Sequence, residues 1–149
     1  MAEEIVNRVA QSSLKVIDLE DFYPQGNRIT IDIKDWLLEG LVLKEKDFRD
    51  QAKEHSWENY KDAFVSIVCS SDAIVPTWAY MLISSNLEPF AKKVIYGSLE
   101  ELESSLYQDI IESLDISEFK DKPVIIKGCS NKPVPTNAYL FLINKLKPV

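Results

Sequence analysis

One stretch of this chain occurs twice, and the repeat constrains the fold more strongly than any other feature of the sequence. Residues 60–90 and 119–149 align without gaps and share 12 identities in 31 positions, where unrelated stretches of ordinary composition would share roughly two. Each copy contains the run Val-Pro-Thr-x-Ala-Tyr, and a Cys-Ser pair lies a few residues before it. Because a repeat of this length indicates a repeated supersecondary unit, the architecture must contain two equivalent units.

The repeated unit is predicted to be a strand followed by a helix. The apolar runs at residues 64–69 and 123–127 are typical of short buried strands, and each is followed by a helix that begins at a proline. Between the copies, residues 93–97 favour a strand, and residues 98–114 favour a helix with a capping box at its start. This alternation predicts an α/β fold in which helices cover a mainly parallel sheet.

Residues 1–59 form an N-terminal extension outside the repeat. Its patterns predict strands at residues 16–19 and 28–33 and helices at residues 3–13 and 44–55. A chain of 149 residues is long enough to bury a sizeable core as one domain. We therefore expect a single domain over residues 1–149.

The composition argues against several partners and compartments. The net charge is −7 and no stretch is strongly basic, so neither nucleic acid nor a membrane surface is an expected partner. The first residues include acids where a signal peptide needs a basic region, which predicts a cytoplasmic protein. Two cysteines are too few for a disulfide framework and fit the same reducing compartment.

The two Cys-Ser pairs mark the candidate functional site. In parallel α/β sheets, ligands collect beyond the carboxyl ends of the strands and beside helix N-termini, whose unpaired N–H groups favour an anion. Cys69-Ser70 and Cys129-Ser130 both occupy such a position. If the two equivalent strands are neighbours, Cys69 and Cys129 approach each other as ligands of a metal or an iron–sulfur unit, or as a redox pair. The ligand-binding residues predicted from the two copies are Cys69, Ser70, Ser71, Asp72, Thr77, Cys129, Ser130, Asn131 and Thr136.

Three interpretations of this site remain open. The first is a non-enzymatic binding or accessory protein that holds a metal, an iron–sulfur unit or a small anion at the Cys-Ser loops, with the cofactor itself left unidentified. The second is a homodimeric interaction module, in which the repeat only pairs strand–helix units and the cysteines are small core residues. The third is an enzyme with a cysteine nucleophile. It is disfavoured because the single histidine, His55, lies in a charged segment that reads as a solvated helix end.

Three runs of the chain resemble an uncharacterised bacterial family, a domain of unknown function. They are CSSDAIVPTWAYML, EGLVLKEKDFR and KGCSNKPVPTNAY, and the resemblance covers the whole chain. The family carries no established activity, but its genes lie near iron–sulfur assembly genes, which implies an accessory protein with a protein partner in that process. Its members also continue into a further strand and a third Cys-Ser run. The repeat gives the same expectation, because the first copy leads into a strand at residues 93–97 and the second copy ends at residue 149.

Overall fold

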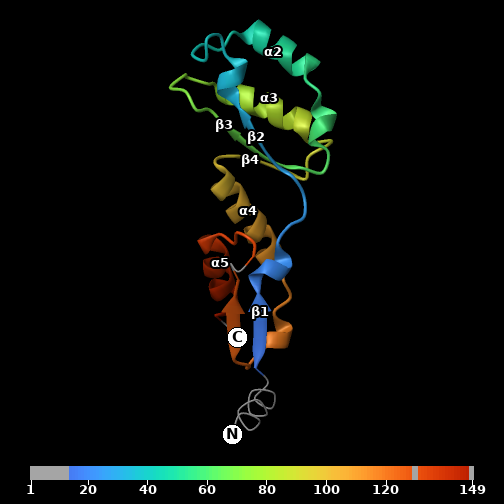
Figure 1. The fold of residues 1–149 in the computed structure, drawn as a ribbon, viewed down its shortest axis with the longest axis vertical. Helices are drawn as coiled ribbons and strands as arrows, with labels where there is room; N and C mark the ends of the chain where they lie inside the picture. The colour runs from blue at the N-terminus through green and yellow to red at the C-terminus, as the bar shows by residue number, and fades with distance from the viewer. Residues whose placement is uncertain (1–13, 129–130, 148–149) are drawn as a thin grey trace. The chain divides into compact units, whose positions relative to one another are not determined.

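The computed structural model describes residues 14–128 and 131–147 and divides them between two compact units. The central unit comprises residues 25–102, and the terminal unit comprises the described parts of residues 1–24 and 103–149. Within these residues all three strand pairs are parallel and helices follow the strands, which confirms the predicted α/β fold (Figure 1). The helix expected at residues 3–13 lies outside the described residues. The assignment of residues 1–149 to one domain stays a prediction.

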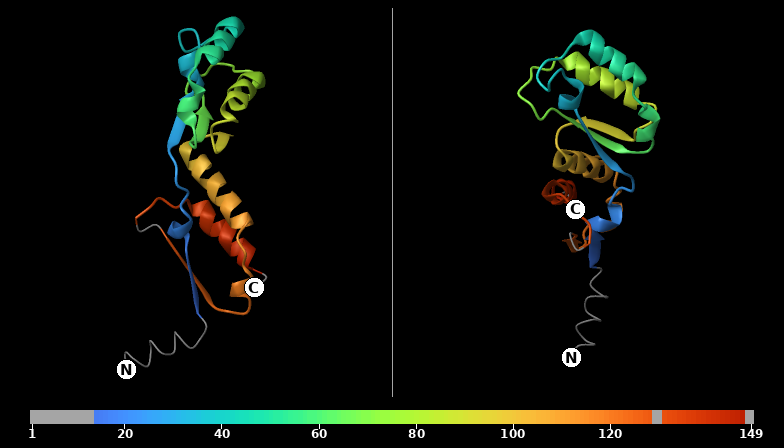
Figure 2. Two further views of the ribbon diagram at one scale, coloured as in Figure 1. Left: turned by 90° about the vertical axis from the view of Figure 1, so that its right-hand side faces the viewer. Right: turned by 45° about the horizontal axis from the view of Figure 1, so that its top comes forward.

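The central unit is built on a three-stranded parallel sheet with the order β2-β3-β4. Its strands are β2 (Arg28–Asp32), β3 (Phe64–Val68) and β4 (Lys93–Tyr96), and its helices are α2 (Glu45–Glu54) and α3 (Thr77–Leu87). The two helices lie side by side on the same side of the sheet (Figure 2). β3 takes the middle position because its continuous apolar run tolerates burial on both faces, and four of its five residues are buried.

An apolar core holds these two helices against the sheet. Phe48 and Ala52 of α2 are buried, as are Ala79, Ile83 and Leu87 of α3, and the four-residue spacing places each set on one face of its helix. Burial of a large apolar side chain stabilises a fold by about 1.5–3 kcal/mol, so Ile83 and Leu87 hold α3 firmly against the sheet. The helix start is thereby held beside the carboxyl end of β3.

His55 lies at the C-terminal end of α2, but its surroundings differ from the expected solvated end. The imidazole is half-buried, its centroid lies 4.6 Å from that of Trp57, and its Nε2 lies 2.8 Å from the Tyr60 hydroxyl. Burial lowers the pKa of the imidazole, and the nearby Glu58 carboxylate offsets part of this effect. The expectation missed this packing because the residues around His55 in the sequence are charged, whereas its aromatic neighbours come from adjoining turns.

The terminal unit contains a two-stranded parallel sheet of β1 (Lys15–Asp18) and β5 (Val124–Lys127). α5 (Thr136–Leu146) buries Ala138, Leu142 and Leu146 in the core of this unit. α4 (Leu99–Glu112) begins among residues of the central unit and ends among residues of the terminal unit, where Tyr107 is fully buried. The Tyr107 hydroxyl donates a hydrogen bond of 2.9 Å to the Leu19 carbonyl. None of the described helices combines the length and the apolar character needed to cross a membrane.

The two copies of the repeat adopt the same local structure, and the equivalence extends to the strand that each copy pairs with. β3 leads through a loop to α3, β5 leads through a loop to α5, and both helices begin directly after a proline in extended conformation. β2 pairs with β3 as β1 pairs with β5. Each of these partner strands ends at an aspartate whose carboxylate accepts a 3.0 Å hydrogen bond from the second residue after it and so starts a 3₁₀ turn, Leu19–Phe22 or Ile33–Trp36.

The partner strands carry a sequence signal that the repeat analysis missed. Residues 17–22 read Ile-Asp-Leu-Glu-Asp-Phe and residues 31–36 read Ile-Asp-Ile-Lys-Asp-Trp, a second repeat with a much shorter spacing. This second repeat is only six residues long, and both of its copies lie in residues 1–59, outside the longer repeat. Each compact unit therefore contains one copy of the short repeat and one copy of the long repeat.

The equivalent strands β3 and β5 belong to different sheets, so they are not neighbours. The condition under which Cys69 and Cys129 were expected to approach each other is therefore not met by strand pairing. β3 has a partner on both edges, whereas β5 pairs only with β1 within the described residues. The remaining 3₁₀ turns, Trp57–Tyr60 and Ser117–Phe119, precede β3 and β5 respectively.

Candidate functional site

A cavity of about 430 Å³ lies at the carboxyl end of β3, where the sequence predicted the first Cys-Ser site. The loop after β3, the start of α3 and the last residue of β4 enclose it. Its lining combines small apolar groups with one thiol and four hydroxyl groups. The residues are Cys69, Ser71, Ala73, Val75, Thr77, Tyr80 and Tyr96.

Cys69 and Ser71 form one wall of this cavity and contact each other. The half-buried Cys69 carries a free thiol, with its Sγ 3.5 Å from the Ser71 Oγ and 3.7 Å from the Ser71 carbonyl oxygen. The Ser71 Oγ also accepts a hydrogen bond of 3.3 Å from the Ala73 N–H. Ser71 therefore fixes the turn of the loop and holds the thiol at the edge of the cavity.

Asp32 anchors the loop from behind, at the end of the neighbouring strand β2. One oxygen of its carboxylate accepts hydrogen bonds from the Ser70 N–H at 3.1 Å and the Lys34 N–H at 3.0 Å. Desolvation raises the pKa of this carboxyl, but the hydrogen bonds from Ser70 and Lys34 outweigh it, and the pKa is lowered overall. Ser70, a predicted ligand-binding residue, thus uses its N–H for this internal contact. Asp32 was not predicted.

The start of α3 supplies donors at the opposite wall. Pro76 is the N-cap residue and no side chain caps the helix, so the first turn carries the partial positive charge of an uncapped helix N-terminus. Thr77, the first helical residue, lines the cavity with its hydroxyl group. Thr77, one of the predicted ligand-binding residues, therefore lies at the positive end of the helix and faces the cavity.

Two tyrosines complete the lining. The Tyr80 and Tyr96 rings lie 4.9 Å apart between centroids at an interplanar angle of 55°. Burial raises the pKa of Tyr80, and the neighbouring Tyr96, Cys69 and Asp32 raise it further, so the phenol stays protonated and remains a donor at neutral pH. The sequence analysis included neither Tyr80 nor Tyr96 among the predicted site residues. The position of Tyr96 at the carboxyl end of a strand was the signal that could have found it.

The loop of the second copy makes different contacts from the loop of the first copy. Cys129 and Ser130 lie outside the described residues. The N–H groups of Asn131 and Lys132 both donate to the Glu20 carboxylate, at 2.5 and 3.0 Å. The loop of the second copy therefore already binds an anion, which the protein itself supplies.

The predicted site residues thus fall into separate places. Cys69, Ser71 and Thr77 meet at the cavity, whereas Asp72 lines a different groove of the central unit. Asn131 and Thr136 belong to the terminal unit. Among the residues that the structure describes, no three His, Cys, Asp or Glu side chains gather as a possible metal site.

The fold and the cavity define a class of protein: an α/β protein with a small polar hollow at the carboxyl end of a central parallel strand. The particular family follows from comparison with known families, because residues 3–149 match the family described as "Protein of unknown function (DUF2480)". The chain belongs to this family, which confirms the resemblance drawn from its motifs. Neither a curated protein nor a solved structure matches the chain.

Proposed function

We propose that the central unit binds a small anionic molecule, a carboxylate or phosphate compound, in the cavity between β3 and α3, and that the protein is a binding or accessory protein. The observation that carries this proposal is the convergence of an uncapped helix start with the hydroxyl groups of Thr77, Ser71 and Tyr80 on one cavity. Neutral donors and a helix N-terminus are the groups that proteins use to hold anions.

The size and charge of the cavity limit the class of ligand that fits it. A volume of about 430 Å³ lies near the lower end of the range for small-molecule sites. No basic side chain lines the cavity, and the Asp32 carboxylate lies behind it, so a multiply charged anion is disfavoured. A singly charged ligand with an apolar body suits it better, because Ala73 and Val75 provide apolar contacts beside the donors.

The second copy supports the choice of an anion. Its loop N–H groups hold the Glu20 carboxylate, whereas Lys34 stands at the equivalent position in the first copy. The first copy therefore has no carboxylate at the position of Glu20; its own internal carboxylate, Asp32, accepts a hydrogen bond from the Ser70 N–H instead. Three expectations from the sequence stay predictions: a metal or iron–sulfur unit shared by Cys69 and Cys129, a protein partner in iron–sulfur assembly, and a homodimer.

Native mass spectrometry of protein purified without oxygen, with elemental analysis, is the first test. A bound organic acid or phosphate compound is the expected result. A stoichiometric metal would overturn the proposal in favour of the thiol site. The same spectrum gives the number of chains in the particle.

An NMR titration with acetate, benzoate and inorganic phosphate is the second test. We expect the amide signals of Thr77, Trp78 and Gly97 to shift, with benzoate binding most tightly because it adds an apolar body. Thr77→Val should weaken binding roughly 10-fold, the effect of one hydrogen bond to a charged group. Thr136→Val is the matched control, because Thr136 starts α5 as Thr77 starts α3, and it should leave binding unchanged. Equal effects of the two substitutions would refute the site.

A further inference from the structure

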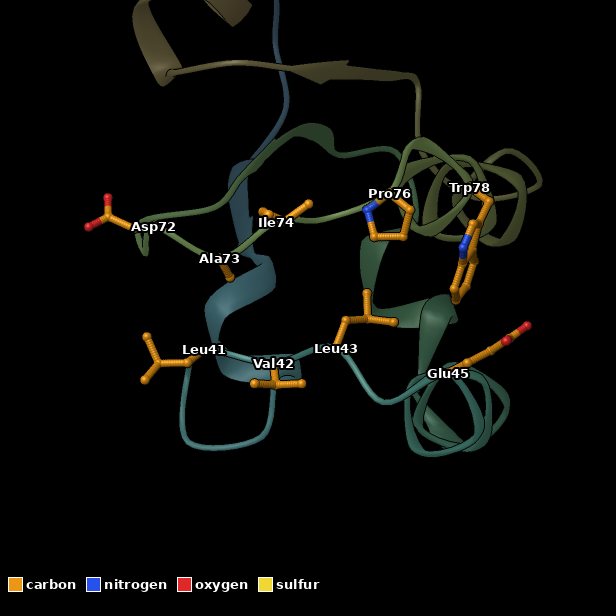
Figure 3. Close-up of a pocket in the computed structure, with 9 residues that line it drawn as sticks. All are labelled: Leu41, Val42, Leu43, Glu45, Asp72, Ala73, Ile74, Pro76 and Trp78. Atoms are coloured by element: carbon orange, nitrogen blue, oxygen red, sulfur yellow. The ribbon is translucent and has the colours of Figure 1, made fainter.

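A second, apolar groove lies in the central unit and shares only Ala73 with the lining of the anion cavity. Its volume is about 620 Å³. Residues 41–43 form one wall, and the loop of residues 72–76 runs opposite them (Figure 3). Asp72 stands at one end of the groove, and Trp78 and Glu45 stand at the other (Figure 3).

A tight turn presents the first wall to solvent. Leu38 and Val42 form an antiparallel bridge, and the Leu41 N–H donates a 3.0 Å hydrogen bond to the Leu38 carbonyl. Glu39 and Gly40, the two residues between Leu38 and Leu41, have φ angles of 53° and 71°. These values are the left-handed conformation of a type I′ hairpin turn. Glutamate tolerates this conformation poorly, so the turn is held against a local preference.

Several large apolar side chains around this turn remain exposed instead of packing in the core. Leu41 is 60% exposed and Val42 is 50% exposed, and across the groove Ile74 is 93% exposed. Isoleucine is among the residues most often buried, so its near-complete exposure beside two other apolar side chains marks an interaction surface. Ala73 and Trp78 add further apolar surface to the groove.

The charges at the groove identify the kind of partner. The two ionisable residues that line it, Asp72 and Glu45, are both acidic and stand at opposite ends. The Glu45 carboxylate pairs with the Arg49 guanidinium at 3.1 Å, on the surface of α2. Asp72 has no ion-pair partner within residues 14–128 and 131–147. The Arg49 guanidinium also lies 4.6 Å from the centroid of the Trp78 ring, so the Glu45 end of the groove carries a balanced ion pair. The groove therefore combines an apolar middle with one negative charge at its other end, that of Asp72, which is unpaired among the described residues.

We infer that this groove docks a segment of another protein in which a lysine or arginine lies beside a few apolar side chains. The apolar side chains fill the space between Leu41, Val42 and Ile74, and the basic side chain meets Asp72. A second copy of this chain fits less well, because its net charge of −7 and its own Asp72 oppose the approach.

Fluorescence anisotropy with two labelled peptides tests this inference. One peptide alternates leucine and lysine, and the other carries glutamate in place of every lysine. We expect the protein to bind the lysine peptide and to bind the glutamate peptide at least 10-fold more weakly. Binding should weaken with added salt, because the Asp72 carboxylate is exposed.

Three variants locate the binding. Ile74→Ser should weaken binding of the lysine peptide roughly 5- to 10-fold. Asp72→Asn should weaken this binding less and should reduce its dependence on salt. Met81→Ser is the matched control, because Met81 is a 65% exposed apolar residue on α3 outside the groove, and it should bind like the wild type. Ile74 and Met81 are both so exposed that neither change should alter the melting temperature, which is measured alongside.

Several results would overturn the inference. These are failure of the wild type to bind the lysine peptide, equal binding of the two peptides, and equal losses in Ile74→Ser and Met81→Ser. Light scattering supplies a further one: a dimer that dissociates in Ile74→Ser would assign the groove to a second copy. None of these outcomes bears on the anion cavity, which is tested separately by Thr77→Val.

Discussion

Glu20 offers the sharpest test of how the repeated loops handle an anion. Its carboxylate accepts two backbone hydrogen bonds, from Asn131 and Lys132, and so ties the loop of the second copy to the turn after β1. Glu20→Ala removes the acceptor and leaves both N–H groups without it. A hydrogen bond to a charged group contributes about 1.5–3 kcal/mol when buried and less when exposed, so we expect a loss of about 2 kcal/mol for the pair.

The measurement is thermal unfolding followed by circular dichroism. For a chain of this size, a loss of about 2 kcal/mol lowers the melting temperature by roughly 4–8 °C. Lys34→Ala is the matched control, because Lys34 holds the equivalent position in the first copy, and it should change the melting temperature by less than about 2 °C.

Chemical rescue makes the test specific to anion binding. If the vacated N–H groups of Asn131 and Lys132 form an anion site, added formate should raise the melting temperature of Glu20→Ala and leave that of the wild type nearly unchanged. Hydrogen exchange should show faster exchange of the two amides in the variant and protection on formate addition. Equal destabilisation by Glu20→Ala and Lys34→Ala, or no response to formate, would refute the reasoning.

Two further predictions concern stability. Because the pKa of His55 is lowered in the folded state, the stability it contributes is present above its unfolded pKa of about 6.5 and is lost as the pH falls through the lower folded pKa. Urea unfolding between pH 8 and 5 should show this decline, and His55→Gln should remove it; an unchanged slope would contradict the assignment. Gly128→Ala should destabilise the protein by about 1–3 kcal/mol, because its Cβ would lie 2.8 Å from the Tyr139 hydroxyl oxygen. In a Tyr139→Phe background the same change should cost clearly less, and an equal cost in both backgrounds would place the clash elsewhere.

Much of the fold followed from local patterns. The strand at β3 was predicted from a continuous apolar run, and α3 and α5 were predicted from proline at the helix start, because both signals depend on neighbouring residues only. Strand pairing did not follow in the same way. β1 pairs with β5 and β2 with β3, so the two equivalent strands enter separate sheets, which no local signal reveals. The short repeat ending in Phe22 and Trp36 was the available clue to the true pairing.

The sequence predicted some of the residues that line the cavity and left others out, and the site itself stays a prediction. Cys69, Ser71 and Thr77 were found because all three follow a strand and precede a helix in the repeat. Asp32 and Tyr96 were missed, since they come from strands on either side of β3 and approach it only through the order of the sheet. Residues that lie on neighbouring strands cannot be assigned to a site until the order of the strands in the sheet is known.

The pairing of β1 with β5 also bears on the order in which the chain gains its structure during synthesis. β1 leaves the ribosome before the central unit and stays unpaired until β5 is made, after the whole central unit has been synthesised. All elements that β3 needs, β2 and β4 included, are available before β5 exists. The central unit can therefore become compact first and bring the two distant strands within reach, which shortens the loop that their pairing must close.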